Sequence, residues 1–321
     1  MKRRFVCLLL VACIGITTVN AGTVKWVDFG IPYESLRYAM QTDIQTFEEE
    51  KHISWIDILA LAGCRTGGKC GLASVKKAAA QLKSDAAPKE LAGELGKYYD
   101  YYYEAYSAVL GGFLGSYAIE INGEWKPVYG LKAFSPIAAG YGYSHCSDFG
   151  NQRSFGFARK HLGNDLMGGL STPIIAVEGG IVEAMGWNRY GGWRIGIRSF
   201  DSRRYYYYAH LQKDKPFAQG LQEGDMVQAG DVIGYMGRTG YSDQENVNNI
   251  ETVHLHFGMQ LVFEEWQKEC NSEIWIDVYN IVRLLSEHRS SVVRDDHGMH
   301  RAYPYRDLDV REYPEKSIFF S

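Results

Sequence analysis

Residues 252–259 read Thr252-Val-His-Leu-His-Phe-Gly-Met259, and polar and apolar residues alternate along this stretch. Because the side chains of a β-strand switch face at every residue, His254 and His256 share one face and the apolar residues beside them occupy the other. Two neighbouring imidazoles can divide the work of a metal ligand and a proton carrier, since neutral imidazole binds zinc and titrates near neutral pH. A strand with two solvated histidines is the alternative, and this stretch alone does not separate the two.

The residues on either side of this strand predict a mainly antiparallel β unit over 130–270. Glycines, aromatic residues and β-branched residues recur there at short intervals. We expect short strands over 173–185, 193–200, 204–211 and 224–234. The first of these is expected to fold back on itself at Gly179-Gly180. A biotinyl or lipoyl carrier hairpin is excluded, because no lysine stands at a hairpin tip in 224–234.

The N-terminal part of the chain predicts a helical module over 22–125. From Pro32 to about Tyr117, apolar residues recur at three- and four-residue steps. Ser54 is the expected N-cap of the second helix, and Pro88 is expected to open a fourth that carries the tyrosine run 98–106. We expect these rings to pack, with carbohydrate binding as the alternative. The chain is therefore expected to have an α+β fold.

The C-terminal part, 271–321, is expected to form a helix followed by a polar tail. Helical spacing covers residues 276–285. From His288 onward the chain carries six basic and six acidic residues, which indicates a solvated, partly ordered extension.

The first residues have the order of a secretory signal peptide. Met-Lys-Arg-Arg precedes an uncharged run to about Thr18, and Val-Asn-Ala ends at Ala21. We therefore expect residues 1–21 to be removed and the chain to act outside the cytoplasm, secreted or attached to the cell envelope. A lipid anchor at Cys13 is the alternative. The formal net charge of -4 gives no case for nucleic acid, and no later segment is apolar enough to span a bilayer.

Four cysteines remain beyond the expected signal peptide, in a compartment that permits disulfides. Cys64 and Cys70 bracket a flexible Arg-Thr-Gly-Gly-Lys loop, and we expect them to form a local bridge. Zinc binding by the cysteines is less favoured, because the chain contains no Cys-x-x-Cys pair.

A second stretch of metal-binding residue types lies upstream, at His161-Leu-Gly-Asn-Asp165. Gly163 argues against a helix. In an extended segment with a kink at this glycine, the side chains of His161 and Asp165 can reach one ion. A His, an Asp and a second His form a three-ligand zinc set that leaves the fourth position to water. Such an ion lowers the pKa of bound water to about 7 and polarises a carbonyl oxygen.

Four motifs follow one another in the chain. They are His-x-x-x-Asp at 161–165, Tyr-x-His-Leu at 208–211, Gly-Asp-x-Ile-Gly-x-x-Gly-x-Thr-Gly at 230–240, and His-x-His-Phe at 254–257. Over roughly 156–262 this series resembles the LytM/lysostaphin-type zinc endopeptidases of peptidase family M23.

The resemblance implies a LytM-like β-sandwich that binds one zinc ion per chain. His161, Asp165 and His256 then correspond to the zinc ligands, and His210 and His254 to the two catalytic histidines that do not bind the metal. The implied substrate is the peptide part of peptidoglycan, either its cross-links or its stem peptides. Zinc-activated water would attack the scissile carbonyl, while the two free imidazoles handle protons or stabilise the oxyanion.

Two further features are expected beside this site. Tyr208 is expected on the same face as His210 and is a candidate hydrogen-bond donor, with packing as the alternative. The polar loop 238–251 is expected to form a wall of the substrate groove.

Two other functions use the same residue types. A two-His, one-carboxylate set also occurs in non-haem iron oxygenases, although these usually place the first His and the acid two residues apart. A catalytically silent protein of the same fold could bind peptidoglycan or activate another hydrolase, but its expected mark is a lost ligand, and none is lost here.

Overall fold

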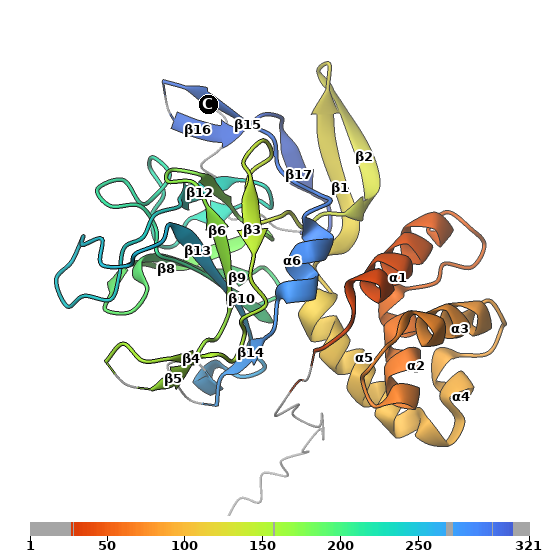
Figure 1. The fold of residues 1–321 in the computed structure, drawn as a ribbon. Coiled ribbons are helices and arrows are strands. Elements are labelled where there is room, and N and C mark those ends of the chain that lie inside the picture. The colour runs from red at the N-terminus through yellow and green to blue at the C-terminus, as the bar shows by residue number, and fades with distance from the viewer. Residues whose placement is uncertain (1–26, 28, 157, 268–271, 297, 311–321) are drawn as a thin grey trace, which may run out of the picture.

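Five helices lead into a mainly antiparallel β region in the computed structural model, which describes residues 27, 29–156, 158–267, 272–296 and 298–310 (Figure 1). The expected signal peptide and Cys270 lie outside the described residues. Within the described part of the chain, no helix is long and apolar enough to cross a membrane. The helices are α1 (Tyr33–Thr46), α2 (Trp55–Thr66), α3 (Leu72–Leu82), α4 (Pro88–Ala92) and α5 (Gly96–Leu110).

The helix starts follow from the capping residues. Ser54 caps α2, since its Oγ accepts a hydrogen bond from the backbone N–H of Ile56 at 3.2 Å. Pro88 opens α4 as expected, but that helix is short and ends at Gly93, whose φ is +57°. The tyrosine run therefore lies in a separate helix, α5, which follows one 3₁₀ turn (Gly93–Leu95). Its rings occupy both faces of α5: Tyr99 and Tyr106 are buried, whereas Tyr98 and Tyr103 are exposed.

The expected helix beyond residue 110 is wrong. α5 ends before Gly111-Gly112, and the chain continues as the hairpin β1 (Leu114–Ile121) and β2 (Glu124–Leu131). β17 (Tyr305–Asp307) from the far end of the chain pairs with β1 and completes a three-stranded sheet. This hairpin spans the expected boundary between 125 and 130, and the division of the chain into domains stays a prediction.

The main sheet has eight strands, and every pairing in it is antiparallel. Its order is β11-β8-β9-β10-β13-β6-β3, and β14 also pairs with β13. The strands are β3 (Tyr143–His145), β6 (Asn164–Gly168), β8 (Gly180–Asn188), β9 (Gly192–Ser199), β10 (Arg204–Ala209), β11 (Met226–Val227), β13 (His254–Leu261) and β14 (Ile274–Ile276). A small hairpin, β4 (Gln152–Arg153) and β5 (Arg159–Lys160), lies beside it.

The strands expected over 193–200 and 204–211 are confirmed, whereas the expected fold-back within 173–185 is wrong. β9 and β10 form a hairpin, and Ser202 at its turn has a φ of +61°. β7 (Pro173–Ile175) does not fold back onto β8, because it pairs instead with β12 (Val232–Tyr235). The glycines at 179 and 180 therefore carry the chain from one sheet to another.

The described residues of the C-terminal part, 272–296 and 298–310, contain strands that the charge pattern does not predict. α6 (Tyr279–Leu285) begins three residues later than expected, and β15 (Val292–Asp295) pairs with β16 (Gly298–Arg301). Asp307 in β17 is buried and accepts hydrogen bonds from Lys132 Nζ at 3.0 Å. The sequence shows an even mixture of charges but not which of them pair with distant residues.

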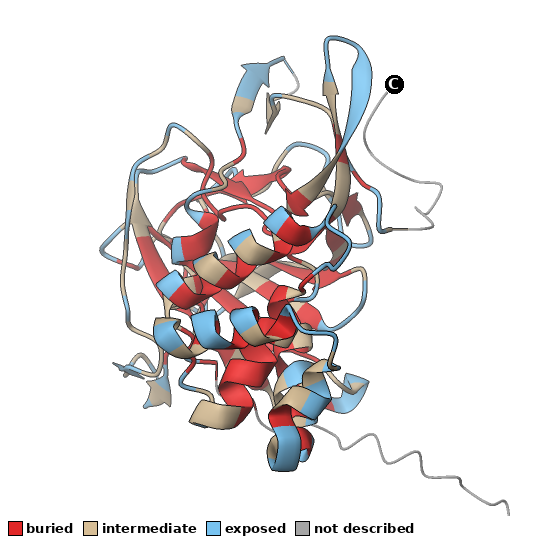
Figure 2. Cartoon of the chain, turned by 90° about the vertical axis from the view of Figure 1, so that its right-hand side faces the viewer, coloured by how far each residue is buried: buried red, intermediate tan, exposed pale blue. Residues whose placement is uncertain are grey.

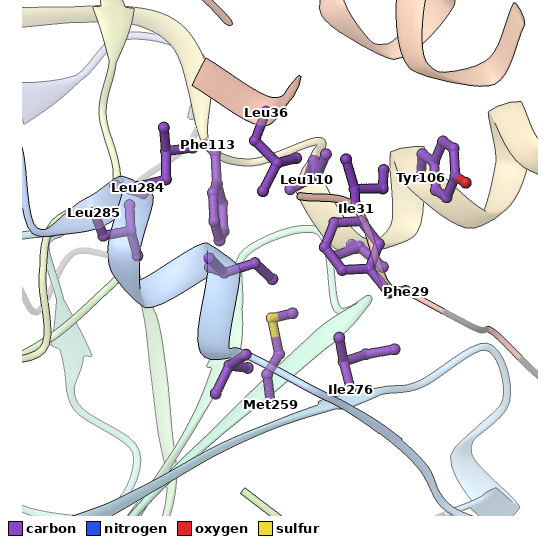
Figure 3. Packing of buried hydrophobic residues seen from close by; sticks show 14 of the residues in the cluster. Phe29, Ile31, Leu36, Tyr106, Leu110, Phe113, Met259, Ile276, Leu284 and Leu285 are labelled. Atoms are coloured by element: carbon purple, nitrogen blue, oxygen red, sulfur yellow. The ribbon is translucent and has the colours of Figure 1, made fainter. Parts of the chain in front are cut away.

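The helices and the main sheet share one hydrophobic core. Figure 3 shows Leu36, Tyr106 and Leu110 from the helices close to Met259 and Ile276 from the sheet, and all five belong to a single buried cluster. Along the helices nearest the viewer in Figure 2, exposed and buried segments alternate, as expected for helices with one face on a core. The helical region therefore packs against one face of the main sheet.

A buried ion pair joins this region to the sheet. Arg204 is fully buried, and its Nε and Nη2 donate to the Glu178 carboxylate at 2.8 and 3.0 Å. Its Nη1 donates to the carbonyl of Ala108 in α5 at 2.8 Å. A side chain at Gly112 would place its Cβ only 1.7 Å from Glu178 Oε1, so this approach requires a glycine.

The expected bridge between Cys64 and Cys70 is not formed. Both are free thiols, and Cys64 Sγ lies 3.2 Å from the carbonyl of Leu61. Cys70 Sγ lies 3.6 Å from the hydroxyl of Tyr106. Burial raises the pKa of Cys70 to about 11, which keeps it a thiol at neutral pH.

Replacing Arg204 by Ala is expected to destabilise the whole chain by about 3 to 5 kcal/mol, because Glu178 would remain buried without its cation. Urea unfolding followed by circular dichroism measures this loss. Arg203→Ala is the matched control, since this neighbour is exposed and should change stability by less than about 0.5 kcal/mol. Equal losses in both variants would contradict the role given to the buried pair.

Candidate metal and catalytic site

β13 carries the histidine pair in the middle of the main sheet. It pairs with β10 on one side and with β6 on the other, and His256 lies opposite both Ala209 and Asp165. His254 and His256 point into one cavity, whereas Leu255 between them is fully buried in the core. The polar–apolar alternation predicted from the sequence is therefore present in this strand.

Three side chains bring their ligand atoms together at this point. His161 Nε2 lies 2.7 Å from His256 Nδ1 and 3.0 Å from Asp165 Oδ1, and the last two atoms are 3.3 Å apart. The ligands of a tetrahedral zinc ion, each about 2.0 to 2.1 Å from the metal, lie roughly 3.3 Å from one another. The residues present thus fit a metal ion of this kind after small outward shifts.

Two residues that the sequence did not indicate hold the ligands in place. Nδ1 of His161 faces Asp148, at 3.1 Å from its carbonyl oxygen and 3.2 Å from its carboxylate. A proton on Nδ1 leaves the Nε2 lone pair directed at the site. Arg153 Nη2 donates to Asp165 Oδ2 at 3.0 Å and to Asp148 at 2.8 Å. Neither residue stands in a short motif with His161, so spacing along the chain gave no signal.

The site attracts cations. Burial lowers the pKa of His161, but hydrogen bonds and charges from Asp148 and Asp165 outweigh it and raise that pKa to about 9. Burial likewise opposes ionisation of Asp165, yet its hydrogen bonds to His161 and His256 hold its pKa well below the usual range. The same acidic groups that favour a proton on His161 also favour a metal ion there.

Two further imidazoles lie beside the three ligand atoms. Nδ1 of His210 donates to the carbonyl of Thr239 at 2.9 Å, and Nδ1 of His254 donates to the carbonyl of Thr252 at 2.8 Å. These bonds assign the proton of each neutral ring to Nδ1 and leave Nε2 as an acceptor. The two ring centroids are 4.7 Å apart, and His254 Nε2 lies 3.7 Å from Asp165 Oδ1. Burial, followed by the charges of the neighbouring histidines, holds the pKa of His210 well below its usual value.

Tyr208 has the packing role that was the alternative, and it does not share a face with His210 as expected. Its ring is fully buried in the core, and its hydroxyl accepts a hydrogen bond from the Val177 N–H at 3.0 Å. His210 follows the end of β10 with a φ of +62°, which breaks the alternation and turns His210 to the opposite face. Tyr207 faces the cavity instead, with its ring centroid 5.8 Å from that of His256.

The site opens into a groove of about 640 Å³. Its floor is the outer face of β8, β9, β10 and β13, and its lining residues lie between positions 153 and 275. Tyr241 comes from the loop 238–251 that was expected to form a wall, and it lines the groove. Phe155, from the β4–β5 hairpin, stacks on Tyr241 at 4.7 Å, so the hairpin and the loop meet along one wall.

Residues 159–269 match the protein family described as peptidase family M23. We call this matched segment the M23 domain. It contains all five expected site residues, and Asp148 and Arg153 lie just before it.

The M23 domain is also similar to proteins of known name. The L-Ala–D-Glu endopeptidase of Bacillus subtilis (strain 168) is 40% identical over 124 residues, which cover 39% of this chain and 36% of that protein. Lysostaphin of Staphylococcus simulans is 36% identical over 98 residues, covering 30% of this chain and 17% of lysostaphin. The chain therefore matches well under half the length of either relative.

A solved structure resembles this chain over most of its length. A LytM-type protein from Ruminococcus gnavus aligns over 84% of this chain and 92% of its own, with a TM-score of 0.54 and 22% identity. This likeness concerns the fold, and it includes regions outside the M23 domain.

Replacing Gly163 by Ala is expected to weaken metal binding. A Cβ at this position would lie 2.8 Å from the His256 ring and 2.6 Å from the Phe257 carbonyl oxygen, so the ring must move out of place. Gly169→Ala is the control, because its Cβ would meet only Thr172 Oγ1 at 3.7 Å. Titration with a competing zinc chelator measures the affinity, and we expect a loss of about 10-fold or more for Gly163→Ala alone. Unchanged affinity would contradict this account of the site.

Proposed function

We propose that the chain is a zinc-dependent endopeptidase that hydrolyses peptide bonds of peptidoglycan. The observation that carries this proposal is the convergence of three ligand atoms and two additional imidazoles on one groove of an M23 domain. The named activities of the relatives, an L-Ala–D-Glu endopeptidase and lysostaphin, support a substrate of this class.

In this proposal His161, Asp165 and His256 hold one zinc ion per chain. Their nitrogen and oxygen atoms are ligands that zinc prefers, and their spacing suits a tetrahedral site. When bound, zinc supplies Lewis-acid chemistry, which acidifies water and polarises a carbonyl oxygen. Arg153 and Asp148 keep the ligands oriented, because each is hydrogen-bonded to the ligand set.

His210 and His254 move protons in the proposed reaction. Because a backbone carbonyl occupies Nδ1 of each ring, only Nε2 remains available to exchange a proton with reactants. One Nε2 accepts the proton that water loses as its oxygen attacks the scissile carbonyl carbon. A proton is then delivered to the amide nitrogen as the carbon–nitrogen bond breaks, which releases a carboxylate and an amine. The burial of His210 favours the neutral ring that this acceptor role requires.

Three alanine variants separate metal ligands from proton carriers. His256→Ala should lose most of its zinc, because only His161 and Asp165 would remain as ligands. His254→Ala and His210→Ala should keep the metal but hydrolyse peptidoglycan about 100-fold more slowly or worse. Zinc content and the fragments released from purified sacculi are measured on each folded variant.

Three outcomes would contradict these assignments. Zinc lost from His254→Ala and kept in His256→Ala would reverse the roles of the pair. Full activity in all three variants would place the reaction elsewhere. A parent protein that binds zinc and sacculi but releases no fragments would be a silent binding protein of this fold.

The proposal includes export from the cytoplasm. A peptidoglycan substrate requires it, and residues 1–21 have the order of a cleaved signal. Protein recovered from outside the cytoplasm is expected to begin at Gly22, which N-terminal sequencing checks. A chain that still begins at Met1 would contradict this, and a lipidated Cys13 as first residue would identify a lipoprotein instead.

A further inference from the structure

A guanidinium nitrogen that lacks a hydrogen-bond partner among the described residues lies in the groove beyond the metal site. Arg194 on β9 lines the groove. Its Nη1 is shielded from solvent, yet no acceptor lies within hydrogen-bond distance among the described residues. An unpaired buried donor is costly, so a ligand that supplies an acceptor there gains more than it would at an exposed arginine.

The register of the sheet fixes where Arg194 lies relative to the reaction. Ile195 pairs with Tyr208, and Ala209 pairs with His256. Continuing the first pairing by one residue places Arg194 beside Ala209, in line with His256 on the next strand. Neighbouring strands are about 4.8 Å apart, so the main chains of Arg194 and His256 are about 10 Å apart. An extended peptide covers that distance in about three residues.

The acidic residues that line the groove near Arg194 have other partners. Glu183 accepts a hydrogen bond from Arg198 Nε at 2.9 Å, and Glu273 accepts one from Trp275 Nε1 at 2.8 Å. Neither of these two hydrogen bonds involves Arg194. These acids repel an incoming anion, so a bound carboxylate needs direct contact with the guanidinium.

The other arginines of the groove are already engaged. Arg153 is committed to Asp148 and Asp165 beside the metal site. Arg159 donates to the carbonyl of Phe155 at 2.8 Å, and its guanidinium lies over the ring of Tyr190. Of the three arginines that line the groove in the described part of the chain, Arg194 is the one with a solvent-shielded donor that lacks an acceptor.

We propose that Arg194 binds a carboxylate of the peptide substrate, within about three residues of the scissile bond, and so selects acidic peptides over peptides made only of glycine. The planar guanidinium fits a carboxylate through paired N–H donors. This inference rests on the proposed function and names the substrate class of the same groove. An L-Ala–D-Glu bond carries a carboxylate in this range, whereas a glycyl-glycine bridge does not.

Two synthetic peptides test the inference on the full-length zinc-loaded protein. Both contain an L-Ala–D-Glu bond; one has its free carboxylates and the other has them converted to carboxamides. The parent protein should prefer the acid in kcat/KM by about 10- to 100-fold. Arg194→Gln should bring this ratio close to unity, and Arg194→Lys should keep part of it because the charge remains but the paired donors do not. Arg203→Gln, an exposed arginine outside the groove, should keep the full ratio.

Binding measured by calorimetry separates this inference from the proposed function. His254→Ala, in which hydrolysis is slow, should bind the acid more tightly than the amide, and the double variant with Arg194→Gln should not. Selective binding without hydrolysis by the parent protein would remove the endopeptidase proposal and keep the carboxylate site. Hydrolysis of both peptides with equal kcat/KM, or a preference that survives Arg194→Gln, would overturn the carboxylate site and leave the endopeptidase proposal standing. Binding of neither peptide would overturn the carboxylate site as well.

Discussion

The register of β13 against its two neighbours is the constraint on which the site depends. A shift of one residue would turn His254 and His256 into the core and bring Leu255 into the groove. The register is fixed from behind, because Leu255, Phe257 and Met259 are all buried on the opposite face. Burial of the apolar side chains on one face of the strand therefore fixes the position of the two histidines on the other face.

Two glycines in or near this strand allow neighbouring segments to approach it closely. Gly163 lets the segment between β5 and β6 approach the His256 ring, and Gly258 lets the Leu162 carbonyl and the Trp275 ring lie against β13. Side chains at these points would separate His161 from the strand that carries its partner. The short distances between the candidate ligand atoms thus depend on two glycines, which have no side chain that could take part in a reaction.

Sequence periodicity predicted the parts of the site that local geometry determines. Alternation predicted the placement of the His254 and His256 side chains, and the extended segment around Gly163 predicted that His161 and Asp165 lie close together. Tyr208 was misplaced because the left-handed backbone at His210 leaves no mark in a polar–apolar pattern. Asp148 and Arg153 were missed because their contacts with the ligands depend on how the β4–β5 hairpin folds back, which is a tertiary property.

The fold shows the same division between local and long-range information. The helix cap at Ser54 and the two strands that form the β9–β10 hairpin depend on local residues, and both were predicted. The pairings of β7 with β12 and of β1 with β17 join residues far apart in the chain, and neither was expected. Lys132 and Asp307 show that a stretch of mixed charge can contain a buried ion pair whose partner lies 175 positions away.

The buried link from Arg204 to α5 has a consequence for how this chain can be controlled. The helices and the sheet share one core, and no described residue before Arg153 lines the groove. The described helices therefore do not line the groove, and the shared core holds them to the sheet. A protease that cuts the connection between them would leave two segments still held together by this core, with the groove no more open than before.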